Sequence, residues 1–136
     1  AAGVGIAQID KLERKISIRK KNADYYKRFI TSNYLQELEC LAEGRPNYYA
    51  IVYKVDHPSL SAAEIGARLN AHGIVSDTHR FKYQVLYKMP LFEPYASVCP
   101  NAEMLSQSII TLPTHEGLTD EDLQFIVSKV NEIVGA

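Results

Sequence analysis

The sequence predicts an α+β fold: a small, mostly antiparallel sheet of about three strands with helices packed against it and a long helix at the N-terminus. Runs rich in tyrosine and β-branched residues, at 48–55 and 109–112, are typical of strands. Apolar residues recur at three- and four-residue steps near both ends, which is typical of amphipathic helices. A chain of 136 residues corresponds to one domain, residues 1–136.

The first predicted helix extends from about Gly5 to Ile30. Its apolar residues lie at helical steps of three, four or seven: Ile6, Ile9, Leu12, Ile16, Ala23, Tyr26 and Ile30. Such a helix is on the order of 40 Å long. Because this is longer than a domain of this size needs, part of it is expected to pack against polypeptide outside this sequence. The start at Ala1, without an initiating methionine or a capping residue, also predicts a chain cut from a longer one.

The next segment is predicted to form a short helix at 34–42 and a strand at 48–55, with a Gly-Arg-Pro-Asn turn at 44–47 between them. The strand is almost continuously apolar, which favours a central position with both faces buried.

A helix and a second strand are predicted to follow. Ser61 is placed to cap the helix, Glu64 has the position of a capping-box acid, and Gly73 ends the helix. Residues 74–80 then predict a strand, although polar residues weaken its alternation.

Residues 81–97 predict a long irregular loop. Pro90 and Pro94 interrupt regular structure. The aromatic residues of the loop are Phe81, Tyr83, Tyr87, Phe92 and Tyr95. A loop this long and this aromatic inside a small domain is expected to line something.

The C-terminal segment is predicted to contain a short helix at 101–106, a strand at 109–112 ended by Pro113, and a final helix. Thr119 and Asp122 have the spacing of a capping box. The apolar face of the final helix consists of Leu123, Ile126, Val127, Val130, Ile133 and Val134.

Charge is unevenly distributed, although the formal net charge is −1. Residues 10–28 carry eight basic and three acidic side chains, a net of +5, whereas residues 93–136 carry one basic and seven acidic, a net of −6. The basic helix face is either a solvated surface or a surface that binds phosphate groups. No aromatic residues interleave with the basic run as in single-strand binders, so nucleic acid is a disfavoured partner.

Several classes of protein are disfavoured by what the sequence lacks. Two cysteines, Cys40 and Cys99, are too few for a disulfide framework and suggest a reducing compartment. No apolar run approaches membrane-spanning length and no signal peptide is evident, so a cytoplasmic protein without a membrane partner is predicted. The histidines and cysteines lack metal-ligand spacing, and no phosphate loop, nucleophile elbow or dinucleotide fingerprint is present.

His79 is a candidate binding residue because it lies where the predicted strand enters the aromatic loop, next to Arg80. One interpretation is a half-buried histidine bonded to a backbone carbonyl. The other is a contact to an anionic or hydroxylated ligand, since histidine and arginine bind phosphates and sugar hydroxyls readily.

Several short motifs follow one another along the chain. They are Gly-Ile-Ala-Gln-Ile-Asp-Lys-Leu at 5–12, Asp-Tyr-Tyr at 24–26, the strand 48–55, Gly-Ile-Val-Ser-Asp-Thr-His at 73–79, Cys-Pro-Asn-Ala-Glu at 99–103 and Leu-Pro-Thr-His-Glu-Gly-Leu-Thr at 112–119. In this order they resemble the C-terminal domain of DegT/StrS-type sugar aminotransferases, fold-type I enzymes that depend on pyridoxal phosphate.

The resemblance implies that residues 1–136 are the small C-terminal domain of such an enzyme. These enzymes pass an amino group from glutamate or glutamine to a keto-sugar nucleotide or a related ketone. The large cofactor-binding domain, with the lysine that forms the Schiff base, is expected to precede Ala1. The chain alone is therefore expected to contain no catalytic or cofactor-binding residue and to hold no pyridoxal phosphate. Because the small domain of the family shapes the sugar pocket at a dimer interface, a homodimer is implied.

The resemblance also implies substrate-binding roles for His79, Arg80 and Tyr87. His79 matches the family's histidine at the edge of the pocket, and Arg80 stands where a tyrosine is usual. The family's common Tyr-x-Pro-Leu-His loop is replaced by residues 83–92, which are closer to the Pro-Leu-Tyr-x-x-Pro-Leu-Phe type of members that act on cyclitols or unusual keto-sugars. The amino acceptor stays open between a keto-sugar and a cyclitol ketone.

Two other hypotheses compete with this one. The chain could be a free-standing module that binds nucleic acid or another polyanion through the basic helix 10–28. It could also be a purely structural dimerisation domain.

Overall fold

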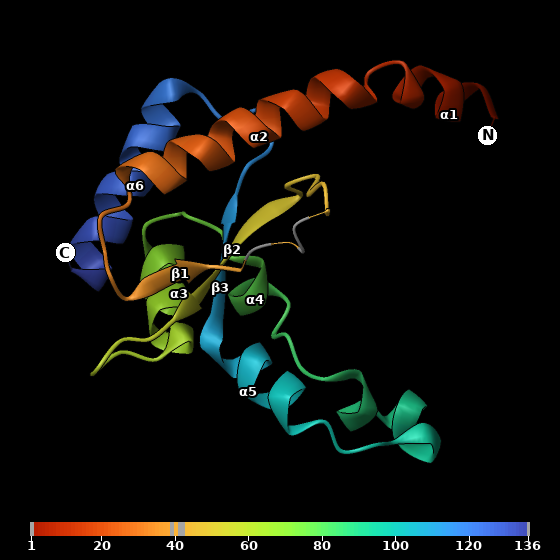
Figure 1. Ribbon diagram of the computed structural model, residues 1–136, viewed down its shortest axis with the longest axis vertical. Helices are drawn as coiled ribbons and strands as arrows, with labels where there is room; N and C mark the ends of the chain where they lie inside the picture. The colour runs from red at the N-terminus through yellow and green to blue at the C-terminus, as the bar shows by residue number, and fades with distance from the viewer. Residues whose placement is uncertain (1, 39, 41–42, 136) are drawn as a thin grey trace.

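The computed structural model describes residues 2–38, 40 and 43–135 (Figure 1). Within these residues, three strands form one sheet in the order β1-β2-β3. They are β1 (Leu35–Glu37), β2 (Ala50–Val55) and β3 (Ile109–Pro113), and both pairings are antiparallel. The predicted α+β fold with a small antiparallel sheet is confirmed.

One face of this sheet packs against the helices α2 (Leu12–Phe29), α3 (Ala62–Ala71) and α6 (Asp120–Val134). α6 contacts both α2 and α3 (Figure 1). In the sheet, Ile51 is opposite Leu112 and Tyr53 is opposite Ile110, so the apolar side chains of β2 and β3 form one layer. The helices complete the core with Ala23, Tyr26, Ala62, Ile65, Leu69, Leu123, Ile126, Val127, Val130 and Val134.

Buried polar side chains of α2 bind the segment that follows β3. Asn22 Nδ2 donates to the carbonyl oxygens of Thr114 at 3.1 Å and His115 at 3.2 Å. The Tyr26 hydroxyl donates to the carbonyl oxygen of Pro113 at 2.8 Å. Burial, with smaller effects from nearby Tyr53 and Asp122, raises the pKa of Tyr26 above its ordinary value. These bonds hold α2 against the segment at the end of β3.

The long N-terminal helix is present but interrupted. α1 (Ala2–Ile9) ends before a turn at residues 10 and 11, and α2 begins at Leu12. Figure 1 shows α1 extending beyond the rest of the fold. Ile6 and Ile9 are 62% and 69% exposed, so no core lies beneath them to hold the helix in one piece.

The predicted helix at 34–42 is wrong in its described part. Residues 35–37 form β1, in which Leu35 is opposite Val55 and Glu37 is opposite Tyr53. The neighbouring strand supplies hydrogen-bond partners that local preference does not reveal, and this tertiary context outweighs a weak helix propensity. Residues 39, 41 and 42 of the predicted helix lie outside the described residues.

The predicted strand at 74–80 is also wrong, because its second half is the single-turn helix α4 (Asp77–Arg80). Thr111 Oγ1 accepts a hydrogen bond from the backbone N–H of Asp77 at 2.7 Å, and Ser76 Oγ accepts one from the backbone N–H of Thr111 at 3.1 Å. Hydrogen bonds to side-chain hydroxyls thus take the place of the backbone hydrogen bonds that a strand would make with β3. The polar residues that weakened the alternation are those that turn the segment into a helix.

β2 is central, as predicted, but it is not buried on both faces. Ile51, Tyr53 and Val55 are buried, whereas Ala50, Val52 and Lys54 between them are only partly buried. The helices therefore cover one face of the sheet and leave the other partly open.

Both predicted capping boxes are confirmed. In α3, the carboxylate of Glu64 accepts hydrogen bonds from the Ser61 backbone N–H at 2.8 Å and hydroxyl at 2.7 Å. In α6, Asp122 accepts from the Thr119 backbone N–H at 2.9 Å and hydroxyl at 3.0 Å. In each box the backbone bond first, and the hydroxyl bond next, lower the pKa of the carboxyl group.

We expect acid to weaken these two helix starts. A carboxyl group whose pKa is lowered by folding stabilises the fold above its unfolded pKa of about 4, and this contribution is lost as the pH falls through the folded pKa. Urea unfolding between about pH 6 and pH 3 should therefore show a shallower loss of stability in the double variant Glu64→Gln, Asp122→Asn than in the parent chain. Equal slopes would contradict the assignment.

Residues 81–108 form an arm that leaves the body of the fold beyond α4 and returns to β3 (Figure 1). The predicted irregular loop contains two short 3₁₀ helices, Leu86–Lys88 and Pro90–Tyr95. α5 (Pro100–Ser108) occupies the position of the predicted helix at 101–106 and is slightly longer. None of the described helices has the length and apolarity needed to cross a lipid bilayer.

Candidate functional site

α4 carries two of the predicted substrate-binding residues, His79 and Arg80, and it is held from two sides. Ser76, just before it, is fully buried and bonded to β3. On the other side α3 approaches closely at Gly66, where an added Cβ would lie 3.1 Å from the Cβ of His79. The backbone of α4 is therefore placed by the fold itself, before any ligand binds.

His79 is exposed and lines a hollow of about 420 Å³ between α3, α4 and α5. Thr78, Lys82, Gln84 and Gln107 supply polar groups to the same hollow. Among the described residues no backbone carbonyl accepts a hydrogen bond from His79, so the half-buried interpretation is not supported. The hollow presents hydroxyl, amide, imidazole and ammonium groups, a set that suits a hydroxylated ligand.

Arg80 lines a different hollow, of about 280 Å³, on the side of α2 and β3. Its guanidinium carbon lies 5.2 Å from the centre of the Phe81 ring. This distance is within the range of a cation–π contact, which limits the directions that the exposed side chain takes.

Tyr87 lines a third hollow, an apolar groove of about 730 Å³ within the arm. Its hydroxyl donates a hydrogen bond to Glu103, and Lys88 forms an ion pair with Glu103 at 2.5 Å. The bond from Lys88 first, and that from Tyr87 next, lower the pKa of Glu103. These contacts connect the first 3₁₀ helix of the arm to α5.

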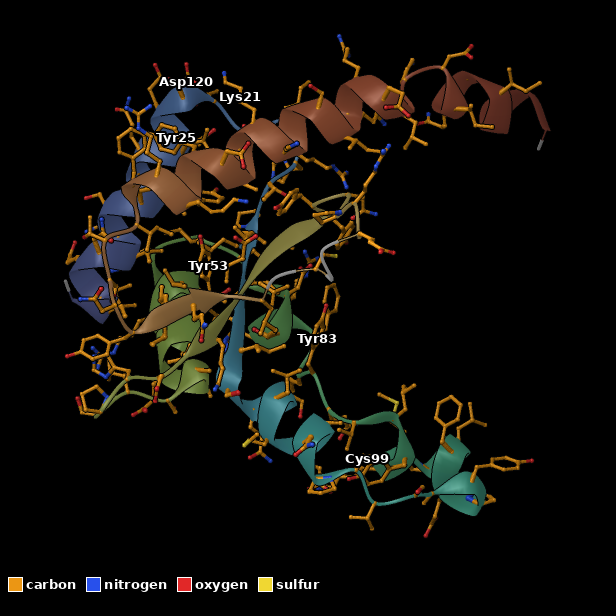
Figure 2. The ribbon with its side chains drawn as sticks, in the orientation of Figure 1. Lys21, Tyr25, Tyr53, Tyr83, Cys99 and Asp120 are labelled. Carbon is orange, nitrogen blue, oxygen red and sulfur yellow. The ribbon has the colours of Figure 1, made fainter. Side chains whose placement is uncertain are left out.

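His79 and Arg80 thus lie on one helical turn, but each lines a different hollow, and Tyr87 lines a third. Lys82, Tyr83 and Gln84 connect two of the hollows, because they line both the His79 hollow and the arm groove. Figure 2 shows Tyr83 where the arm leaves the body and Cys99 farther along the arm.

Sequence reasoning missed Lys82 as a site residue. Its backbone φ is 48°, in the left-handed region that residues other than glycine rarely adopt. This conformation turns the chain from α4 into the arm. Backbone strain of this kind is frequent at functional sites, but nothing in the local sequence signals it.

The basic face of α2, predicted as a possible polyanion surface, is partly neutralised by acidic groups near α6. Lys15 and Arg19 each lie 3.5 Å from Glu116, and Lys21 lies 4.0 Å from Asp120. Figure 2 shows Lys21 and Asp120 on the same side of the molecule. Opposite charges that are far apart in sequence therefore meet in the fold.

Solved structures of other proteins contain this fold. The chain superimposes on DesV of S. venezuelae, solved in complex with a ketimine intermediate, with a TM-score of 0.82 at 18% identity, over 99% of this chain and 36% of that one. It matches PseC of Helicobacter pylori, an aminotransferase involved in the biosynthesis of pseudoaminic acid, with a TM-score of 0.77 at 22% identity, over 96% of this chain and 35% of that one. At these identities the likeness shows a shared fold, which covers about a third of each of those chains.

The sequence match then gives the family. The model of the DegT/DnrJ/EryC1/StrS aminotransferase family matches residues 1–131, and the chain belongs to this family. The GDP-perosamine synthase of Caulobacter vibrioides is 21% identical over 98% of this chain and 36% of its own length. The chain therefore spans about a third of the curated relatives that it matches, and the predicted resemblance is confirmed.

The described residues do not by themselves fit the cofactor of the family. Lys82 is the lysine that lines both the His79 hollow and the arm groove. Neither hollow is lined by an aspartate or glutamate that could pair with the pyridine nitrogen of pyridoxal phosphate. Across the described part of the chain, no group of three or more His, Cys, Asp and Glu side chains is arranged to hold a metal ion either.

Proposed function

We propose that this chain is the small C-terminal domain of a pyridoxal-phosphate aminotransferase that passes an amino group from glutamate or glutamine to a keto-sugar nucleotide or a cyclitol ketone. The observation that carries the proposal is the family match over residues 1–131 by a chain that spans about a third of its relatives. On this proposal the large domain belongs to the remainder of a longer polypeptide, and the chain alone transfers no amino group.

Support for a missing partner domain comes from the N-terminal helix. Ile6, Ile9 and Leu12 are exposed on α1 and at the start of α2, which extend beyond the body of the fold. An exposed apolar surface of this kind suits contact with another domain of a longer protein.

The cofactor would be held outside this chain. Spr1654 of Streptococcus pneumoniae, a structural neighbour, was solved in PLP and PMP forms, which supports pyridoxal phosphate as the cofactor of the complete protein. The lysine that binds it would lie on the large domain, because the two hollows that Lys82 lines have no aspartate or glutamate among their described lining residues. The cofactor, when bound, would supply the electron sink for amino transfer.

The role of this chain would be to bind and orient the amino acceptor. His79 and the polar side chains of its hollow would hold sugar hydroxyl groups, and Arg80 would bind an anionic group. Tyr87 would contact the acceptor from the arm. Because α4 is held by β3 and α3, these contacts would be made at fixed positions.

The complete protein would act as a homodimer in the cytoplasm. The arm exposes apolar side chains far from the core, among them Leu91, Tyr95 and Val98, at 78%, 85% and 79%. A second copy would cover such a surface. The ion pairs between α2 and the acidic segment near α6 weigh against the alternative of a free-standing polyanion-binding module.

The test compares the 136-residue chain with the complete gene product. After incubation with pyridoxal phosphate and dialysis, the complete protein should retain the visible absorbance of the bound cofactor and the chain should not. In the complete protein, His79→Ala should lower kcat/KM for the acceptor by about tenfold or more, the effect of losing a hydrogen bond to a polar ligand group in a closed site. His72→Ala, at the exposed C-terminal end of α3, is the matched control.

Two results would contradict the proposal. One is retention of the cofactor by the 136-residue chain. The other is a complete protein that binds the cofactor but aminates neither keto-sugar nucleotides nor cyclitol ketones.

A further inference from the structure

The Arg80 hollow has an unusual balance of free hydrogen-bond donors. It lies where α2, α4 and the ends of β2 and β3 meet, and has a volume of about 280 Å³. Two arginines, Arg19 and Arg80, and one histidine, His115, line it. They come from three separate parts of the chain, which only the fold brings together.

The threonine hydroxyls of the hollow are already used. Thr111 Oγ1 accepts from the backbone N–H of Asp77 at 2.7 Å. Thr114 Oγ1 donates to the carbonyl oxygen of Tyr48 at 2.5 Å. Because these groups are satisfied within the fold, the capacity that remains for a ligand is mostly on the two guanidinium groups and the imidazole.

The guanidinium group of Arg19 is held in place, but not all of its hydrogen-bond donors have partners. Its guanidinium carbon lies 5.6 Å from the centre of the Tyr49 ring, and one terminal nitrogen lies 3.5 Å from a Glu116 oxygen. Its Nε is buried and has no hydrogen-bond partner among the described residues. A buried donor without a partner costs free energy, so the guanidinium group of Arg19 is not fully satisfied within the fold.

His115 offers a donor to the same hollow. Its Nδ1 accepts a hydrogen bond from the backbone N–H of Gly117 at 3.2 Å. In a neutral imidazole the other ring nitrogen, Nε2, then carries the hydrogen and acts as a donor.

The charges also favour an anion. Lys15 and Arg19 share the single carboxylate of Glu116. Asp77 is the acidic side chain that lines the hollow, three residues before Arg80 on the same turn of α4. Among the charged side chains that line the hollow, Arg19 and Arg80 against Asp77 leave one net positive charge.

We propose that this hollow is an oxyanion-binding site, in which Arg19, Arg80 and His115 donate hydrogen bonds to a carboxylate or phosphate group. Guanidinium groups bind such planar or tetrahedral anions through paired N–H donors. The inference deepens the proposed function, from which it takes Arg80, and adds Arg19 and His115, which have no role in that proposal.

The site is tested on the 136-residue chain by NMR, with acetate and inorganic phosphate as separate probes at constant ionic strength. Saturable shifts of the Nε–Hε signals of Arg19 and Arg80 and of the His115 ring are expected with at least one probe. Arg80→Gln should weaken that binding by about tenfold or more. Arg68→Gln, which changes an exposed arginine on α3, is the matched control and should bind as the parent does.

A second variant separates geometry from charge. Arg19→Lys keeps the positive charge but removes the Nε donor and the fork, so binding should weaken although the net charge is unchanged. The probe that saturates identifies the group as a carboxylate or a phosphate. If neither saturates, or if Arg80→Gln and Arg68→Gln bind alike, the inference is overturned.

These results do not depend on the amino-transfer reaction. If the chain binds neither anion, the proposed anion site is wrong and the proposed aminotransferase function is unaffected. A complete protein that takes up no pyridoxal phosphate removes the proposed function, even if the isolated chain binds an anion here.

Discussion

Replacing Ile110 by alanine is expected to lower the free energy of unfolding by about 3 kcal/mol, within the usual range for a substitution that creates a cavity in the core. Ile110 is fully buried on the covered face of β3, opposite Tyr53 of β2. The truncation removes apolar contacts and leaves a void that the sheet and helices cannot fill completely. Urea unfolding followed by far-UV circular dichroism measures the change.

The neighbouring residue is the matched control. Ile109 is the same residue type on the same strand, but it lies on the other face and is only partly buried. Ile109→Ala should therefore cost about 1 kcal/mol, in proportion to the smaller area that it removes from water. Equal losses for the two variants would show that the burial of the two faces of β3 is not as described.

Asn22→Ala is expected to cost about 2 kcal/mol. Asn22 is 4% exposed, and its side-chain amide donates to the carbonyl oxygens of Thr114 and His115. Each hydrogen bond contributes about 1 kcal/mol, and the Thr114 carbonyl loses a partner in a buried environment. Because this contact fixes α2 over the end of β3, the His115 ring signal should also shift in the NMR spectrum of the variant.

Asn131 provides a matched control for this second prediction. It also makes two hydrogen bonds to a distant segment, accepting from the Thr31 backbone N–H at 3.1 Å and donating to the Phe29 carbonyl oxygen at 3.0 Å. These bonds are solvent-exposed, so water can replace them. Asn131→Ala should cost less than about 1 kcal/mol, and an equal or larger loss would contradict the assigned role of burial.

Most of the regular structure could be predicted from local patterns. The strands at β2 and β3, the helices α3 and α6 and both capping boxes follow from spacings within ten to fifteen residues. The type of element was predicted wrongly at β1 and α4, where the deciding hydrogen bonds come from residues distant in sequence. The spacing of residue types along a segment contains no information about hydrogen-bond partners that are distant in sequence.

The candidate site divides in the same way. His79 and Arg80 were singled out because a polar pair stood between a patterned segment and an aromatic loop. That they face different hollows, and that Lys82 turns the chain through a left-handed conformation, could not be read from the sequence. Arg19 is 61 residues before Arg80 and has no motif that connects it with the same hollow.

The sequence by itself determined the α+β class, the central strand, the capped helices and the aminotransferase family, because each depends on patterns written along the chain. Only the tertiary structure decided which sheet face stays open, how α4 is fixed and which donors surround the Arg80 hollow. The physical reason is that hydrogen-bond satisfaction and burial depend on neighbours in space, and β3 brings those neighbours together from the two ends of the chain.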